Sequence, residues 1–174
     1  IVGVYIIGWI TAFGGGTIRD VLLDNQPLYW IQHAEYPLAL LIIAIIMSMI
    51  NTLRIKESWL LVPDAIGMSV FAITAAQAAV NMDLPIIIVG ILSTIVATFG
   101  GVLRDSLCQE IPIIFRQEST LYASLAFVGG ACFAWLMKTE LLDQTATVLV
   151  CSIMVFLCRI LAYKFDIKFK KPII

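Results

Sequence analysis

Six long apolar stretches dominate the chain and constrain its fold more than any other feature of the sequence. Each is close to the length of about 20 mostly apolar residues that an α-helix needs to span a bilayer. Hydrophobic residues make up 61% of the chain and charged residues 13%, which is too apolar for an ordinary soluble domain. This composition excludes soluble enzymes, nucleic-acid-binding domains and disordered chains, and it predicts an all-α membrane protein. The stretches are residues 1–23, 36–51, 59–81, 84–108, 119–137 and 145–163.

Residues that build catalytic or metal centres are sparse. The four cysteines form no Cys-x-x-Cys pair and the single histidine, His33, is far from them in the sequence, so no metal site beyond a permeating monovalent cation and no cofactor is predicted. Ser69 and Ser93 have no histidine partner, which indicates that the protein is not an enzyme. The net charge of −1 gives no reason to expect a nucleic-acid partner.

An internal repeat becomes visible when the sequence is shifted by 85 positions. Residues 15–32 then show seven identities in 18 positions, and these include Gly-Gly-x-x-Arg-Asp with a proline eight residues after the arginine. Chance matches between apolar residues do not explain glycine, arginine, aspartate and proline in one register. The matched pairs are Gly15/Gly100, Gly16/Gly101, Arg19/Arg104, Asp20/Asp105, Leu22/Leu107, Pro27/Pro112 and Gln32/Gln117.

The two copies are predicted to have opposite orientations in the membrane. Equivalent points are separated by three spans, and an odd number reverses the chain direction, as in many transport proteins. Repeat one is about residues 1–52, repeat two about 59–138, and a C-terminal helix about 145–163 precedes a basic tail, 164–174, all in one membrane domain. Because a span precedes the glycine-bearing helix only in repeat two, we expect a seven-helix fold whose first helix is missing from this chain.

The distribution of lysine and arginine predicts the orientation. The loops 51–58 and 109–118 and the tail carry seven basic residues, whereas the opposite side carries only Lys138. By the positive-inside rule the C-terminus is cytoplasmic, in a multi-pass protein of the cell (inner or plasma) membrane. The basic tail is expected to contact anionic lipid head groups.

The glycine runs are the main candidate for function. Each mid-span glycine weakens a helix by about 1 kcal/mol relative to alanine, so we expect a kink or an unwound turn at each run. Carbonyl oxygens before the break, with nearby hydroxyls, would then face a pore and suit a partly dehydrated monovalent cation. The alternative is that the glycines only allow close helix packing. The candidate pore residues are Gly14, Gly15, Gly16, Gly100, Gly101, Thr11, Thr94 and Thr98.

Five charged residues lie within or at the ends of the spans: Arg19, Asp20, Asp64, Arg104 and Asp105. A charge inside a membrane costs about 2.5–3.5 kcal/mol on insertion scales, so it usually has a partner or faces water. Consecutive residues on a helix do not face each other, so we do not expect Arg19 to be neutralised by Asp20. Asp64 and Arg104 are predicted at the same depth and are expected to pair. The alternative is that these charges lie at the interface and reach into water.

The doubled Gly-Gly-x-x-Arg-Asp motif and the stretch Pro-Asp-Ala-x-Gly-x-x-x-Phe-Ala at residues 63–72 resemble one family over essentially the whole chain. It is the prokaryotic branch of the trimeric intracellular cation (TRIC) channels, whose domain is also labelled glycine transporter or UPF0126. The resemblance implies homotrimers with a pore in each subunit, kinked glycine-bearing helices and permeation of monovalent cations, mainly potassium. The alternative function is a secondary transporter of glycine or a similar small zwitterion, because a broken helix offers ends for both an ammonium and a carboxylate.

Overall fold

The computed structural model describes residues 2–49, 57–115 and 121–165, and in these ranges the chain is helical with no strand. Six long helices coincide with the six predicted spans to within a few residues, which confirms the all-α fold. They are α1 (Val2–Leu22), α3 (Glu35–Met49), α4 (Glu57–Val80), α5 (Ile86–Leu107), α6 (Tyr122–Thr139) and α7 (Gln144–Lys164). The short helix α2 (Tyr29–Gln32) and the 3₁₀ turn η1 (Ile113–Phe115) lie in equivalent connections of the two repeats.

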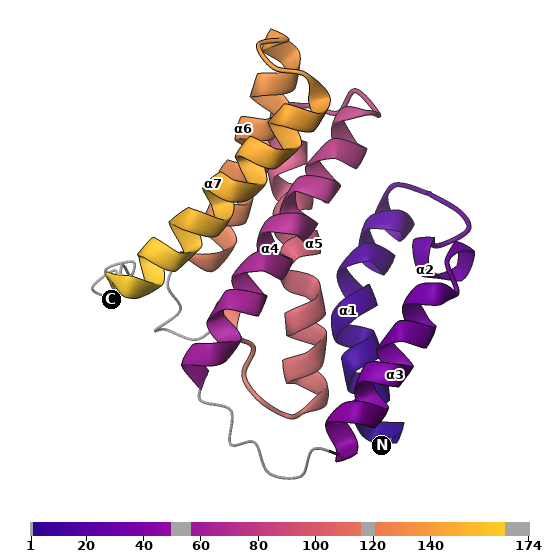
Figure 1. The fold of residues 1–174 in the computed structure, drawn as a ribbon. Coiled ribbons are helices and arrows are strands. Elements are labelled where there is room, and N and C mark those ends of the chain that lie inside the picture. Colours follow the sequence, from indigo (N-terminus) through magenta and orange to yellow (C-terminus); the bar gives the residue numbers. More distant parts are fainter. Residues whose placement is uncertain (1, 50–56, 116–120, 166–174) are drawn as a thin grey trace.

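Helix α5 lies at the centre of the bundle. It packs against α4 and α6 on one side and against α1 on the other, while α3 contacts the rest of the protein mainly through α1 (Figure 1). Helices α1 and α5 are equivalent in the two repeats and run in opposite directions, as the inverted repeat predicts (Figure 1). The two repeats therefore meet at the contact between α1 and α5.

Small residues allow the second repeat and α7 to pack closely. Five alanines of α4 are buried, and Phe133 of α6 and Val155 of α7 complete the core beside them. A methyl group on Gly130 of α6 would lie 2.5 Å from the Cβ of Ser93 on α5, so only glycine fits at this contact. Close approach through small residues is the usual way in which helices associate in membranes.

The outer surface is apolar, as expected for a protein in lipid. Large side chains of α3 and α7, among them Ile42, Ile43, Ile153 and Leu157, are about half exposed. Among the described residues, three helices are long and apolar enough to span a membrane by length and composition: Leu61–Val80, Ile86–Leu107 and Gln144–Lys164. Helices α1 and α6 have 21 and 18 residues, so they are of comparable length.

The prediction of orientation depends largely on residues outside the described part of the chain. Arg54, Lys56 and Arg116 lie there, as do the lysines of the tail beyond residue 165. The orientation therefore stays a prediction.

Candidate functional site

The glycine runs lie where α1 crosses α5. A methyl group on Gly15 would overlap the carbonyl oxygen of Val96, and one on Gly100 would lie 2.5 Å from the carbonyl oxygen of Thr11. These two contacts are equivalent under the 85-residue shift, so each helix presents a glycine to the backbone of the other. Gly14 adds to the crossing, because its methyl group would lie 3.4 Å from the Cα of Gly100.

The expected unwinding at the glycines is wrong. Helix α1 continues through Gly14–Gly16 and α5 continues through Gly100–Gly101 as α-helix. The cost of the glycines is offset by the close approach of two helices that only glycine permits. The packing alternative therefore accounts for Gly14, Gly15 and Gly100.

The three threonine hydroxyls bond to their own helices. Thr11 donates to the carbonyl of Ile7 at 2.7 Å, and Thr94 and Thr98 donate to the carbonyls four residues earlier at 2.9 Å. The three hydroxyl oxygens can therefore still accept hydrogen bonds. The helices are unbroken beside them, however, so the expected unwound turn is absent. Thr11 faces the cavity described below, whereas Thr94 borders a separate open groove between α5 and α6.

A cavity of about 280 Å³ lies beside the helix crossing. One water needs only about 10–15 Å³, so the cavity has room for several waters or a hydrated ion. Its lining includes three pairs of repeat-equivalent residues, Thr11/Val96, Ala12/Ala97 and Gly15/Gly100. The cavity therefore borders the contact between the two repeats, and its other eight lining residues come from repeat two. Transporters built from inverted repeats also place their substrates at the repeat interface.

Helix α4 forms one wall of this cavity. The lining residues Asp64, Gly67, Met68 and Phe71 are spaced at three and four positions, so they lie on one face of the helix. Gly101 also lines the cavity, and apart from its own stretch of helix no atom lies within 4 Å of the place where its Cβ would be. By contrast, Gly16, its equivalent in repeat one, is not among the lining residues.

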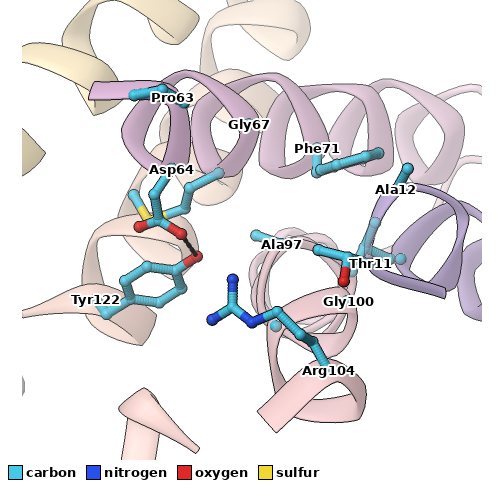
Figure 2. Close-up of a pocket in the computed structure, with 14 residues that line it drawn as sticks. Thr11, Ala12, Pro63, Asp64, Gly67, Phe71, Ala97, Gly100, Arg104 and Tyr122 are labelled. Atoms are coloured by element: carbon cyan, nitrogen blue, oxygen red, sulfur yellow. Dashed lines mark hydrogen bonds between the residues drawn. The ribbon is translucent and has the colours of Figure 1, made fainter. Parts of the chain in front are cut away.

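One end of the cavity is charged. Figure 2 shows the carboxylate of Asp64 beside the hydroxyl of Tyr122, which donates a long hydrogen bond of 3.4 Å, with the Arg104 guanidinium directed toward the same space. The Asp64 side chain is about one third exposed and that of Arg104 slightly more. A carboxylate and a guanidinium from two helices thus face the same cavity.

Asp64 and Arg104 lie at the same depth and line the same cavity, as expected, but they form no direct salt bridge with each other. The salt bridge of Arg104 is to Asp105 at 2.8 Å, and that of Asp64 is to Arg159 of α7 at 3.8 Å. The Arg159 guanidinium also lies 4.5 Å above the Tyr122 ring. Sequence analysis missed both Arg159 and Tyr122, although an arginine inside an apolar span is itself a signal of an intramembrane partner.

The expectation that Arg19 is not neutralised by Asp20 is also wrong. Arg19 binds one oxygen of Asp20 through Nε at 2.8 Å and Nη2 at 2.7 Å, and Arg104 binds Asp105 in the same way. Adjacent side chains leave a helix in different directions, but the long arginine side chain folds back over the carboxylate. Both aspartates are almost fully buried, so the doubled Arg-Asp motif forms two ion pairs at equivalent positions.

Asp20 also fixes the connection after α1. Its second oxygen accepts a hydrogen bond from the backbone N–H of Tyr29 at 3.0 Å, and Asn25 donates to the first oxygen at 3.4 Å. One buried carboxylate thus links the end of α1 to the start of α2.

Among the described residues, no three His, Cys, Asp or Glu side chains gather closely enough to hold a metal ion.

The chain is similar in sequence to a known family of membrane proteins. The chain matches the family described as glycine transporter over residues 1–52 and 61–138. It is 31% identical to the UPF0126 inner membrane protein YadS of Escherichia coli (strain K12), over 95% of this chain and 80% of YadS. It is 36% identical to the UPF0126 membrane protein YvgT of Bacillus subtilis (strain 168), over 97% of this chain and 81% of YvgT.

Solved structures of cation channels have the same fold. A structure that explains conductance through TRIC cation channels superposes with a TM-score of 0.88 at 27% identity, over 99% of this chain and 84% of that one. A prokaryotic TRIC channel crystallised in 0.5 M KCl gives a TM-score of 0.84 at 32% identity, over 94% and 82% of the two chains. The TRIC trimeric intracellular cation channel orthologue from Rhodobacter sphaeroides gives 0.79 at 28% identity, over 94% and 93%.

Proposed function

This chain belongs to the family of UPF0126 membrane proteins and TRIC cation channels, and from this premise we propose that it is a membrane channel for monovalent cations, potassium in particular. The observation that carries the proposal is the cavity at the junction of the inverted repeats. It combines space for a hydrated ion with a carboxylate, Asp64, at one end. Arg104 lies at the same end but is paired with Asp105, so the Asp64 carboxylate is left to attract cations there.

The path of the cation is proposed to follow the contact between the two repeats. The ion enters beside Asp64, passes Gly101 and reaches the crossing of α1 and α5, where the carbonyl oxygens of Thr11 and Val96 lie close to the opposite helix. These oxygens and the Thr11 hydroxyl replace part of the hydration shell. Conduction requires a small separation of the two helices, because their backbones are in contact at Gly15 and Gly100.

The proposal also covers how the subunits assemble and how the chain is oriented in the membrane. Because the Rhodobacter sphaeroides protein is a trimeric channel, we infer a homotrimer in which each subunit has its own pore. The C-terminus is assigned to the cytoplasm, so the Asp64 end of the cavity is the cytoplasmic end. The tail 164–174 is expected to contact anionic lipid.

A second candidate function is transport of a small zwitterion such as glycine. The specific observation in its favour is that Asp64 and Arg104, of opposite charge, line the same cavity. An α-amino acid carries an ammonium and a carboxylate that these two side chains would bind. The same cavity therefore fits either function, and only transport measurements separate them.

The test uses purified protein in liposomes. We expect potassium flux down its gradient in the absence of glycine, above that of protein-free liposomes. Uptake of labelled glycine is measured in the same preparation. Saturable glycine uptake without potassium flux would replace the channel with the transporter.

A further inference from the structure

Arg159 is an unusual residue for its position. It lies in the last part of α7, which belongs to neither repeat, and it is only 5% exposed. Helix α7 packs against α4 and α6, and Arg159 extends from it toward Asp64 of α4 and over Tyr122 of α6. It contacts two residues that line the cavity but is itself not among the lining residues.

Its bond to Asp64 is long. The Arg159 Nη2 and Asp64 Oδ2 atoms are 3.8 Å apart, whereas the arginines of the two Arg-Asp motifs approach their carboxylates to 2.7 and 2.8 Å. Charge-assisted hydrogen bonds in proteins are typically about 2.7–2.9 Å long. The Tyr122 hydroxyl is also distant from Asp64, at 3.4 Å. Asp64 is therefore a carboxylate with two long contacts, at the wall of a cavity that the Arg104 guanidinium also faces.

The Tyr122 ring gives Arg159 a second partner. With the guanidinium 4.5 Å from the ring centre, the contact is a cation–π interaction. This interaction does not use Asp64, so it persists when the carboxylate binds another cation. A neighbouring ring thus allows the guanidinium to give up Asp64 without losing all of its contacts.

We propose that Asp64 is a binding site for a monovalent cation and that Arg159 competes with the ion for it as a tethered cation. The proposal rests on the proposed function and names Arg159 as the residue that sets the affinity of the cavity for the ion. Two cations compete for one carboxylate because each weakens the attraction felt by the other. Arg159 thereby keeps potassium binding weak, so that an ion that enters the site also leaves it.

The test compares three variants with the unchanged protein. Arg159→Gln removes the competing charge, Arg159→Lys retains it, and Lys164→Gln removes an equal charge from an exposed site on the same helix. We expect Arg159→Gln to lower the potassium concentration that gives half-maximal flux by about fivefold or more, the lower limit of typical coupling between two sites. The half-maximal potassium concentrations of Arg159→Lys and Lys164→Gln should stay within about twofold of that of the unchanged protein.

Thermal stability gives a readout that does not depend on flux. In Arg159→Gln, potassium replaces the lost guanidinium at Asp64, so KCl should raise the melting temperature more than choline chloride of equal ionic strength. Asp64→Asn combined with Arg159→Gln should abolish this difference. An unstable Arg159→Gln protein remains informative, because rescue by potassium but not by choline is still expected.

Two results would overturn the inference. One is an unchanged or higher half-maximal potassium concentration in Arg159→Gln; the other is equal stabilisation of that variant by the two salts. Absence of potassium flux from the unchanged protein would instead contradict the proposed channel. The salt dependence of melting would still test the cation site on its own.

Discussion

The contact between α1 and α5 makes a quantitative prediction about neighbouring glycines. A methyl group on Gly100 would lie 2.5 Å from the carbonyl oxygen of Thr11, whereas one on Gly101 meets no atom within 4 Å outside its own stretch of helix. Carbon and oxygen normally approach to about 3.3 Å, so Gly100→Ala requires the helices to separate locally by about 0.8 Å. The carbonyl is backbone and cannot rotate away as a side chain would.

The two substitutions share one favourable effect. Alanine stabilises a helix by about 1 kcal/mol relative to glycine, and this gain applies equally to Gly100→Ala and Gly101→Ala. Only Gly100→Ala adds overpacking, which costs about 1–3 kcal/mol. The difference between the two variants is therefore about 1–3 kcal/mol, with Gly101→Ala the more stable.

The measurement is thermal unfolding of the purified protein in detergent, followed by circular dichroism. At about 2–4 °C per kcal/mol for a chain of this size, Gly100→Ala should melt roughly 2–12 °C below Gly101→Ala. The repeat supplies an independent copy, because Gly15→Ala should melt below Gly16→Ala for the same reason. Equal melting temperatures within both pairs would refute the tight crossing on which the cavity depends.

Two further predictions concern Asp20 and the orientation. Asp20→Asn leaves Arg19 without its carboxylate and should destabilise the protein by about 3 kcal/mol, measured by the same melting experiment. Asp24→Asn is the control, because Asp24 is exposed and asparagine tolerates its positive φ of 51°; equal effects would contradict the role of Asp20. Cys108 is exposed at the end of α5, so a membrane-impermeant maleimide should label it in inside-out vesicles and not in right-side-out ones. The reverse pattern would invert the assigned orientation.

The helices were predictable because their signals are local. The six apolar stretches predict the positions and the number of the spans, and the repeat at a shift of 85 positions predicts their inversion. Neither prediction requires knowledge of which side chains touch. The repeat also singled out the doubled glycines, and the structure places them where the repeats meet. Their local conformation was predicted wrongly, because helix propensity ignores the neighbouring helix that makes glycine favourable at Gly15 and Gly100.

The charged end of the cavity was less predictable. The depth of Asp64 and Arg104 followed from the spans, and both line the cavity, but their partners depend on side-chain reach and on how α7 packs. Arg159 comes from a helix outside the repeat, so symmetry gave no indication of it. A search of each apolar span for isolated arginines would have found the residue, though not its partner.

The central claim is that cations pass through the cavity beside the glycine crossing, and matched leucines test it most directly. Gly101 lines the cavity and Gly16, its repeat equivalent, does not. An added Cβ at either position meets no atom within 4 Å outside its own stretch of helix. Potassium flux is measured in liposomes for Gly101→Leu and Gly16→Leu, after gel filtration shows that both variants assemble like the unchanged protein. We predict that Gly101→Leu abolishes the flux and that Gly16→Leu retains most of it. Full potassium flux through Gly101→Leu would contradict this account.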